Sequence, residues 1–390
     1  MSFQNQYNPT TLTETEIIEW SEFCAKCFSY KANPPSSRYF QRHFYNDPRR
    51  DASLIHVMRY EIPKEDDNDN CLQRTEMVSS VRVFKRIVSL GRKGDTLVAG
   101  GIGEVCTHIS HQRKGLAKRL LQFALENVQG NESLKMQISM LHASPQLTKV
   151  YESSAGYKSV VSHWSVLPFV LLPPLLQQNE EWNSMKRSHH GAYIRLAKFP
   201  QDTLAMQKIH EEYSQDRLVG CIIRTPEYWN DYLSKEIGDS LFVLMVEQTI
   251  VAWMSIRSRS ENRFQLREYG IVNSTTLQQC NLTNTNVFSI LFQRAIKQHL
   301  SDNESSTTNT NAHGETFELH LPTFVLKELQ ETCLKDHGSD TLQWIDFCNP
   351  MIYSEDDHGW MYKLLNANHK NVFDIVEEGV SHLIWPSDSF

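Results

Sequence analysis

Hydrophobic and polar positions change their spacing near residue 116, which predicts a strand, a turn and a helix in succession. Residues 97–109 are largely apolar and rich in β-branched side chains, a pattern typical of a buried strand. From Leu116 the apolar side chains recur every three or four positions as far as Val128, so the spacing predicts an amphipathic helix that ends near Gly130. Between the two lies a short basic segment that contains Gly115.

The same patterns predict a mixed α/β unit over residues 1–172. A capping-box sequence, Thr13 to Glu16, opens a first helix, and Ser144 is the expected N-cap of a later one that ends near Gly156. The other expected elements of this unit are a short helix over 37–45 and strands over 52–62, 77–90 (one strand or two), 135–143 and 157–167.

The second half of the chain repeats this order of elements, although not its residues. Residues 173–191 are rich in Pro, Gln and Asn and are the expected linker. Asn273–Asn286, at the place of the basic segment, has no glycine and no basic residue, and 301–315 are low in complexity and predicted to be disordered. The expected elements are strands over 192–197 and 264–272, two strands within 239–257 that turn near Gln248, and helices over 201–213, 226–237 and 287–300.

Composition limits the classes of function. The apolar share of 40% and the charged share of 22% are those of a soluble globular chain. The first residues carry no basic stretch followed by an apolar core, and the longest apolar run, 166–176, is too short for a bilayer, which needs about 20 residues. We therefore expect a cytoplasmic protein with no membrane partner and with reduced cysteines, among which Cys24 and Cys27 are core residues of a helix.

Charge is distributed unevenly between the two halves. Residues 1–172 hold 21 Lys and Arg against 17 Asp and Glu, a net charge of +4, and residues 173–390 hold 18 against 29, a net charge of −11. A basic first half suits a polyanionic cofactor, and an acidic second half suits a cationic substrate, although a solvated face gives the same composition. This distribution argues against nucleic acid as the main partner.

The strand, the basic turn and the helix together predict an anion-binding site. The first N–H groups of a helix have no partner within it, and the helix dipole favours negative charge there. Gly115 lets the backbone approach a ligand closely. Positive charge comes from four side chains, Arg113, Lys114, Lys118 and Arg119. A diphosphate would fit such a site.

Two motifs in this unit resemble those of the GNAT acetyltransferases. The first is Gln112-Arg113-Lys114-Gly115-Leu116-Ala117, which is similar to the family loop Q/R-x-x-G-x-G/A, with Ala117 at the last glycine position. The second is Val150–Tyr157, with a tyrosine five residues before its glycine and an aromatic residue after it. The resemblance implies a GNAT-type mixed sheet flanked by helices over residues 1–172 and a degenerate GNAT-like α/β domain over 192–390. It also implies that the loop amides bind the pyrophosphate of acetyl-CoA, the co-substrate, with no metal ion.

Acetyl transfer from a thioester to an amine requires a neutral amine, a polarised carbonyl and a proton for the leaving thiolate. In the family, backbone amides of the strand before the loop hold pantetheine and polarise the carbonyl, which implies Val105, Cys106 and Thr107. A family tyrosine on the following helix faces the cofactor sulfur, which implies that Tyr151 protonates the thiolate, with core packing as the alternative. Ser144 stands where many relatives have an asparagine that contacts pantetheine, or it is only a helix cap.

The general base is less sharply indicated. Glu104 is the first candidate, because its apolar strand would raise the pKa of its carboxyl group toward a useful value. The alternative for this residue is a structural pair with a neighbouring Lys or Arg. His108, His142 and a chain of water molecules are the other candidates.

The acceptor amine is suggested by the arrangement of the whole chain, which resembles the fungal lysine N-acetyltransferases. That group acetylates the ε-amine of free L-lysine in lysine catabolism, so we expect a small-molecule amine, L-lysine first, with a carboxylate partner for its charge. A polyamine or a protein amine is the alternative acceptor. A non-catalytic acyl-CoA-binding regulatory protein is the alternative function, and the oligomeric state is left open.

Overall fold

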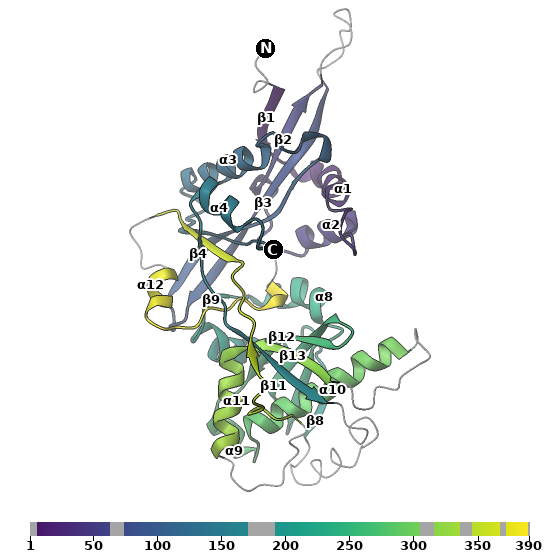
Figure 1. Ribbon diagram of the computed structural model, residues 1–390, viewed down its shortest axis with the longest axis vertical. Coiled ribbons are helices and arrows are strands. Elements are labelled where there is room, and N and C mark those ends of the chain that lie inside the picture. Colours follow the sequence, from purple (N-terminus) through teal and green to yellow (C-terminus); the bar gives the residue numbers. More distant parts are fainter. Residues whose placement is uncertain are drawn as a thin grey trace, which may run out of the picture.

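The computed structural model describes residues 6–62, 74–170, 192–304, 316–335, 345–366 and 372–388. Within them the chain forms two mixed β-sheets, each covered by helices, which stand one above the other in Figure 1. The expected mixed α/β fold with two units is therefore confirmed. The predicted linker and most of the segment predicted to be disordered (residues 305–315) lie outside the described residues. In the described ranges no helix combines the length and the apolarity needed to cross a membrane.

The first sheet begins with an antiparallel run and continues with a parallel pair. The strands of the run pair in the order β1 (Tyr7–Thr11), β2 (Ile55–Glu61), β3 (Thr75–Leu90) and β4 (Thr96–Thr107). β4 then pairs in parallel with β5 (Ile138–His142). A parallel pair requires a crossover connection, and α3 (Leu116–Gly130) supplies it. The segment over 77–90, predicted as one strand or two, is the single long strand β3.

Helices cover both faces of this sheet. α1 (Ile17–Cys27) and α2 (Ser37–Tyr45) pack around Trp20, whose indole N–H donates to Ser80 Oγ at 2.9 Å. α3 packs on the other face through residues such as Leu120. Thr13 and Glu16 form the predicted capping box, in a 3₁₀ turn that precedes α1.

The helix predicted to begin at Ser144 begins later. α4 spans Thr148–Ala155, and residues 144–147 form a turn in which the N–H of Leu147 donates to the carbonyl of Ser144 at 2.8 Å. Ser144 is therefore not the N-cap of α4, because its carbonyl closes a turn one step before the helix. The end at Gly156 is as predicted, with this glycine in the left-handed conformation that suits a helix C-terminus.

The second sheet repeats the strand order of the first. The order β8–β10–β11–β12–β13 matches β1–β2–β3–β4–β5, with antiparallel pairs up to β12 and a parallel pair between β12 and β13. These strands are β8 (Tyr193–Leu196), β10 (Phe242–Val246), β11 (Thr249–Ser260), β12 (Arg263–Ile271) and β13 (Thr316–Pro322). The helices of this unit are α7 (Thr203–His210), α8 (Ser234–Ile237), α9 (Ser274–Gln279), α10 (Asn284–Glu304) and α11 (Thr323–Lys335). Two π-helical turns, Glu211–Gln215 and Tyr228–Leu233, follow α7 and precede α8.

The two halves of the chain exchange strands between the sheets. β7 (Trp164–Val170), from the first half of the chain, pairs with β13 in the second sheet, and β15 (Trp360–Leu364) returns to pair with β5 in the first. The strand predicted over 157–167 is thus two strands in different sheets, β6 (Lys158–Ser159) and β7. Sheet membership therefore crosses the predicted boundary at residue 172. The remaining short elements are β9 (Val219–Ile222), which pairs with β3, β14 (Tyr353–Ser354), which pairs with β7, and α12 (Val372–Glu377).

Buried polar groups fix the end of the chain between the two sheets. Arg224, which follows β9, is fully buried, and its Nη2 donates to Glu268 of β12 at 2.6 Å and to Asp388 at 2.7 Å. His382 is also buried, with Nδ1 2.6 Å from Ser162 Oγ and Nε2 2.7 Å from the hydroxyl of Tyr362 on β15. Because the partners come from distant segments, these contacts join both units and the C-terminal segment.

Candidate active site

β4 carries a bulge where the site begins. The antiparallel register of β3 and β4 shifts here, so that Glu104 and Val105 together face Val81. Glu104 has a φ of 54°, in the left-handed region that residues with a side chain seldom adopt. The parallel register of β4 and β5 ends just before the bulge, at Ile102 and Leu141. The two strands are therefore no longer paired where Glu104 and Val105 lie.

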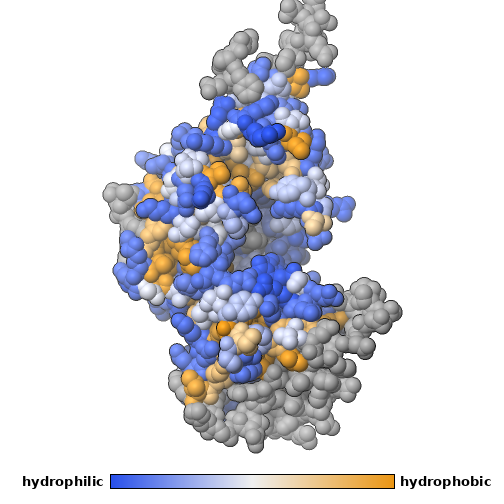
Figure 2. Space-filling model, viewed as in Figure 1, coloured by the Kyte–Doolittle hydropathy of each residue, from blue (hydrophilic) through white to orange (hydrophobic). Residues whose placement is uncertain are grey.

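A cavity of about 820 Å³ opens at this point between the two units. Its volume falls in the range of about 300–1,000 Å³ that is usual for small-molecule sites. Figure 2 shows the surface hollowed between the upper and lower parts of the molecule. Its walls come from the segment after α1, from β4, β5 and α4, and from the second sheet with the C-terminal segment. Eight polar lining residues carry the argument below, Glu104, His142, Ser144, Tyr151, Arg257, Arg259, Gln265 and Asp357.

Glu104 presents a nearly buried carboxyl group to this cavity. Its side chain is only 6% exposed, and Oε2 accepts no hydrogen bond from the described residues and lies 3.5 Å from Nη1 of Arg82. Burial raises the pKa of Glu104, and the positive charge of Arg82 opposes that rise. Glu104 therefore has the raised pKa expected of a general base and also the basic neighbour expected of a structural ion pair. Its role as general base stays a prediction that this geometry fits.

Tyr151 and Ser144 line the same cavity from the far side of β5. The Tyr151 ring packs edge-on against Tyr157, with centroids 6.2 Å apart, and burial raises the pKa of its hydroxyl. The phenol is therefore protonated at neutral pH, and among the described residues its hydroxyl has no hydrogen-bond partner. Ser144 is exposed on the turn before α4. Both placements are compatible with the predicted roles, an acid for the thiolate and a contact to pantetheine.

The predicted anion-binding loop adopts the required conformation. Gly115, with a φ of 73°, is the N-cap of α3, and Arg113 also has a positive φ of 60°. The backbone N–H groups of Leu116, Ala117 and Lys118 form the open first turn of α3 and donate to no described residue. Outward-facing N–H groups at a helix N-terminus suit a phosphate. Pyrophosphate binding stays a prediction, and the conformation of the loop supports it.

Side chains hold this loop to the sheet. The amide of Gln112 donates to the carbonyl of Thr107 at 3.2 Å, which fixes the loop to the end of β4. Nζ of Lys114 donates to the hydroxyl of Tyr7 on β1 at 3.0 Å. The positive charge of Lys114 is therefore held beside the start of α3 by the sheet.

The three residues predicted to present amides to pantetheine have different surroundings. Val105 lines the cavity. Cys106 and Thr107 are back in register with β3, where Ser79 Oγ donates to the carbonyl of Cys106 at 2.7 Å and lies 2.9 Å from Thr107 Oγ1. The side chain of Cys106 is buried with Cys24 under α1. The structure thus brings Val105 to the site and leaves the other two outside its lining.

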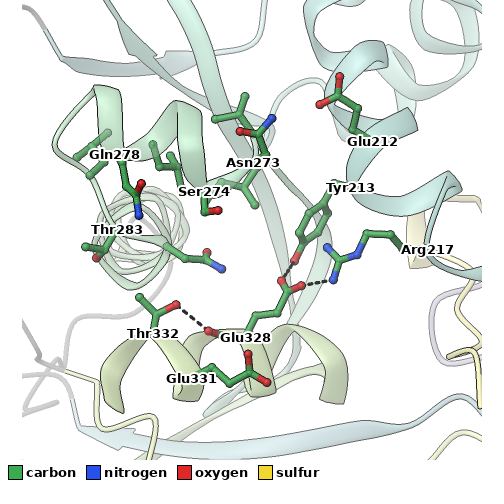
Figure 3. Close-up of a pocket in the computed structure, with 15 residues that line it drawn as sticks. Glu212, Tyr213, Arg217, Asn273, Ser274, Gln278, Thr283, Glu328, Glu331 and Thr332 are labelled. Atoms are coloured by element: carbon green, nitrogen blue, oxygen red, sulfur yellow. Dashed lines mark hydrogen bonds and ion pairs between the residues drawn. The ribbon is translucent and has the colours of Figure 1, made fainter. Parts of the chain in front are cut away.

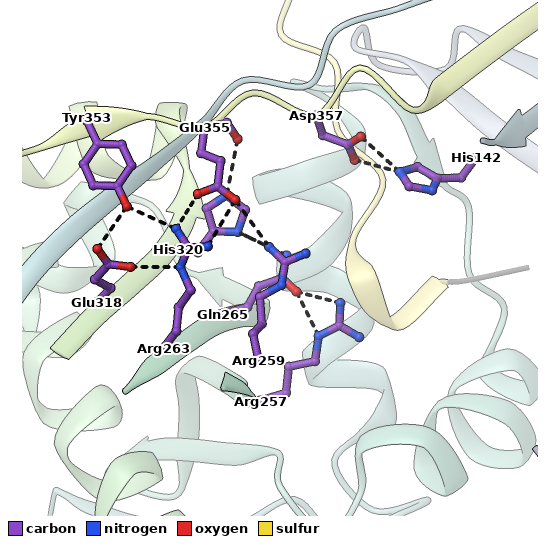
Figure 4. Close-up of polar contacts among 10 residues, drawn as sticks. All are labelled: His142, Arg257, Arg259, Arg263, Gln265, Glu318, His320, Tyr353, Glu355 and Asp357. Carbon is purple, nitrogen blue, oxygen red and sulfur yellow. Dashed lines mark hydrogen bonds and ion pairs between the residues drawn. The ribbon is translucent and has the colours of Figure 1, made fainter. Parts of the chain in front are cut away.

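The cavity also holds a histidine–carboxylate pair of which the sequence predicts only the histidine. Nε2 of His142, at the end of β5, lies 3.0 Å from both carboxylate oxygens of Asp357 (Figure 4). The N–H of Gly359 donates to the same carboxylate at 2.8 Å. Burial alone would raise the pKa of Asp357, but His142 and the N–H of Gly359 lower it overall. His142 is therefore oriented at the site, whereas His108, the other histidine considered as base, is not among the lining residues.

Metal ligation finds no support in the described residues, which contain no group of three His, Cys, Asp or Glu able to hold an ion. Cys24 is buried and Cys27 is half-buried, and both pack in the core cluster of α1 and α2. This placement confirms that the two cysteines are core residues of a helix.

A second cavity, of about 580 Å³, lies in the second unit at the position that corresponds to the anion-binding loop (Figure 3). The segment from β12 to the start of α10 forms one wall, and Glu328 and Glu331 of α11 form another. Arg217, the basic residue of its described lining, is paired with Glu328, whose other carboxylate oxygen accepts from the Tyr213 hydroxyl at 3.0 Å. The acidic excess would repel a diphosphate, as expected for a unit without the cofactor loop.

Comparison with known proteins agrees with this geometry. The model of the acetyltransferase (GNAT) domain matches residues 8–158, and no curated protein matches the chain. A GCN5-related N-acetyltransferase from Anabaena variabilis is similar in structure, with a TM-score of 0.53, 13% identity, and 92% of this chain and 73% of that chain covered. A conserved protein of unknown function from Enterococcus faecalis, described as a probable N-acyltransferase, has a TM-score of 0.52 at 12% identity and covers 92% and 72%. These likenesses extend over both units and show a shared fold. Residues 8–158 of this chain thus match the acetyltransferase (GNAT) domain.

Proposed function

We propose that the protein moves an acetyl group from acetyl-CoA directly to an amine, the ε-amine of free L-lysine being the first candidate. One observation carries the proposal: Glu104 and Tyr151 line a single cavity at the point where β4 and β5 cease to pair. β4 then runs from this cavity into the anion-binding loop, so one continuous segment serves both ends of a long cofactor.

Binding of acetyl-CoA in this proposal uses the backbone more than side chains. The N–H groups at the start of α3 hold the pyrophosphate, and Lys114 and Arg119 add positive charge. The pantetheine arm enters between β4 and β5, where Val105 faces the cavity. Acetyl-CoA supplies the activated acyl group, and everything else in the reaction is proton transfer and orientation.

The chemistry then needs proton transfers at the amine and at the thiolate. Glu104 accepts a proton from the ammonium group of the acceptor, directly or through water, since a raised pKa brings its carboxyl group closer to the pH at which the reaction runs. The neutral amine attacks the thioester carbonyl, the C–N bond forms and the C–S bond breaks. Tyr151 donates its phenolic proton to the leaving thiolate, the bonded nitrogen gives its extra proton through water to the resulting phenolate, and Glu104 releases its proton to solvent. His142, held by Asp357, is the alternative acceptor of the first proton.

The size of the cavity supports a small acceptor. Phe28, Tyr30 and Pro35 line it from the segment after α1, and Trp385 lines it from the C-terminal segment. Its volume of about 820 Å³ is that of a small-molecule site. Free L-lysine as the first candidate follows from the resemblance to the fungal lysine N-acetyltransferases.

The test is a thiol-release assay with acetyl-CoA and the full-length protein, with L-lysine, ornithine, spermidine and a histone-tail peptide as acceptors. We expect the greatest release with L-lysine. Glu104→Gln and His142→Gln should separate the two candidate bases, because only the true base is needed for the chemical step. Saturable acetyl-CoA binding without release for any amine would overturn the proposal in favour of a regulatory acyl-CoA-binding protein.

A further inference from the structure

The wall that the second sheet contributes to the site cavity is basic. Arg257 and Arg259 are two positions apart on β11 and therefore on one face of the strand, and both line the cavity with Gln265 of β12. Nε and Nη2 of Arg257 donate to Gln265 Oε1 at 2.8 and 2.6 Å, which fixes the guanidinium at the cavity wall (Figure 4). Although residues 173–390 are acidic as a whole, this part of them presents positive charge to the site.

Arg257 has no acidic partner in the described part of the chain, where no carboxylate oxygen lies within 4.0 Å of its nitrogen atoms. The carboxylates on this side of the sheet, Glu318 and Glu355, pair with Arg263, and Glu355 also lies 4.0 Å from Nη1 of Arg259 (Figure 4). Burial, followed by the positive charges of Arg267 and Arg259, lowers the pKa of Arg257 to about 10. The guanidinium is therefore still charged at neutral pH, among other cations and with no anion beside it.

A guanidinium with no acidic partner is stabilised when an anion occupies its front. Its planar fork matches a carboxylate, to which it can donate two parallel hydrogen bonds. The opposite wall of the same cavity carries Glu104 and Tyr151, the groups suited to an amine and a leaving thiolate. The cavity thus offers an acidic end and a basic end to one small molecule.

We propose that Arg257, held by Gln265 and assisted by Arg259, binds a carboxylate of the acceptor, so that the substrate class is an amine that also carries a carboxylate, such as an amino acid. This inference rests on the proposed acetyl transfer and deepens it. A polyamine would place a second positive charge against Arg257 and Arg259 and would be excluded. Arg257 is then the residue that determines specificity, while the first unit performs the chemistry.

The experiment compares acceptors that differ only by the carboxylate. The pairs are L-lysine with cadaverine and L-ornithine with putrescine, each measured as kcat/KM in the thiol-release assay. For the wild-type protein we expect the carboxylated member to be preferred by about 10- to 100-fold, the usual effect of hydrogen bonds to a charged group. Arg257→Gln should remove this preference through a higher KM for the amino acids, with kcat/KM for the diamines unchanged or higher.

Controls keep a folding defect apart from a loss of recognition. Arg217→Gln, the same change at the second cavity, should leave the preference intact. Arg257→Gln should keep wild-type affinity for acetyl-CoA and a wild-type circular dichroism spectrum. Equal use of both members of each pair by the wild-type protein, or a preference that survives in Arg257→Gln, would overturn this inference while acetyl transfer stands. No thiol release with any of the four amines would instead overturn the proposed function.

Discussion

The two units share a strand order and differ at one connection. In the first, β4 passes through a short basic loop into α3, and Gly115 takes the left-handed conformation at the turn. In the second, β12 passes through a longer segment that contains α9, has neither glycine nor basic residue, and faces Glu328 and Glu331 across a cavity. The crossover between the two parallel strands is present in both units.

This difference teaches that the fold supplies a position for an anion and that a few residues decide whether the position is used. A helix N-terminus attracts negative charge in either unit, since the peptide dipoles are the same. Acidic neighbours at the start of α10 cancel that attraction, and basic neighbours at the start of α3 reinforce it. The second unit instead contributes Arg257 to the wall of the first unit's site.

The largest expected effect comes from placing a negative charge in the loop of the first unit. Gly115→Glu should weaken acetyl-CoA binding by roughly 100-fold or more, because the new carboxylate repels the diphosphate and the left-handed φ strains the turn. Isothermal titration with acetyl-CoA measures this affinity. The same charge introduced beside the second cavity, Ser274→Glu, should leave it unchanged. Equal affinities for both variants would remove the distinction between the two connections.

Removal of one hydroxyl from the first unit should slow the reaction without loosening the cofactor. Tyr151→Phe should lower kcat by about 100-fold, the scale of a lost general acid, with acetyl-CoA affinity within a factor of about two. Tyr353→Phe, on the edge strand of the second sheet, should have wild-type kinetics. A fully active Tyr151→Phe protein would make Tyr151 a packing residue of α4.

A smaller effect is expected for a substitution in β9, the strand of the second half that pairs with β3 of the first sheet. Gly220 of β9 has a φ of 87°, and an added Cβ would lie 2.7 Å from the Tyr362 hydroxyl and 2.8 Å from His382 Nε2. Gly220→Ala should lower the free energy of unfolding by roughly 2–4 kcal/mol, from strain and overpacking together. Gly94→Ala is the matched control, because its φ of 83° is similar and nothing lies within 4 Å of the added atom.

Urea denaturation followed by tryptophan fluorescence and by circular dichroism measures both glycine variants. We expect one transition in each, since the two sheets share strands and buried clusters. Two separate transitions, or equal losses for Gly94→Ala and Gly220→Ala, would show that β9 contributes little to joining the two units.

The smallest expected effect is a displaced pH profile. Arg82 lowers the pKa of Glu104, and burial raises it, so removal of the positive charge leaves burial less opposed and raises the pKa further. Because the base must be deprotonated, the acidic limb of kcat/KM against pH should move to higher pH in Arg82→Gln, by about one pH unit or less. Arg82→Lys keeps a positive charge and should move it less. If the acidic limb of kcat/KM moves in neither Arg82 variant, Glu104 is not the base, and His142 becomes the candidate.

Local chemistry explains which parts of the site could be predicted. The loop and the start of α3 follow from a glycine, a basic turn and helical spacing within 20 residues, all of which act along a short stretch of chain. The left-handed φ of Glu104 and the end of the β4–β5 register depend on three strands together, so only the residue type at this position could be predicted.

The exchanged strands are the part that sequence reasoning could not supply. β7 and β15 are short apolar segments, and their periodicity is compatible with either sheet. Their partners β13 and β5 are distant in the chain, and nothing in the spacing of residues specifies such a pairing. Asp357 was missed for the same reason, because it reaches His142 only when β15 lies beside β5.

The exchange of strands determines when the first sheet can be completed during synthesis of the chain. β5 emerges from the ribosome long before β15, which completes the same sheet more than 200 residues later. At a translation rate of about 5–20 residues per second, the edge of β5 stays unpaired for about 10–40 seconds. An unpaired edge strand can pair with strands of other chains. A messenger cut near codon 172 would leave that edge open permanently. We therefore expect the first sheet to be completed only after β15 has been translated, although the segments that resemble GNAT motifs, 112–117 and 150–157, are made long before it.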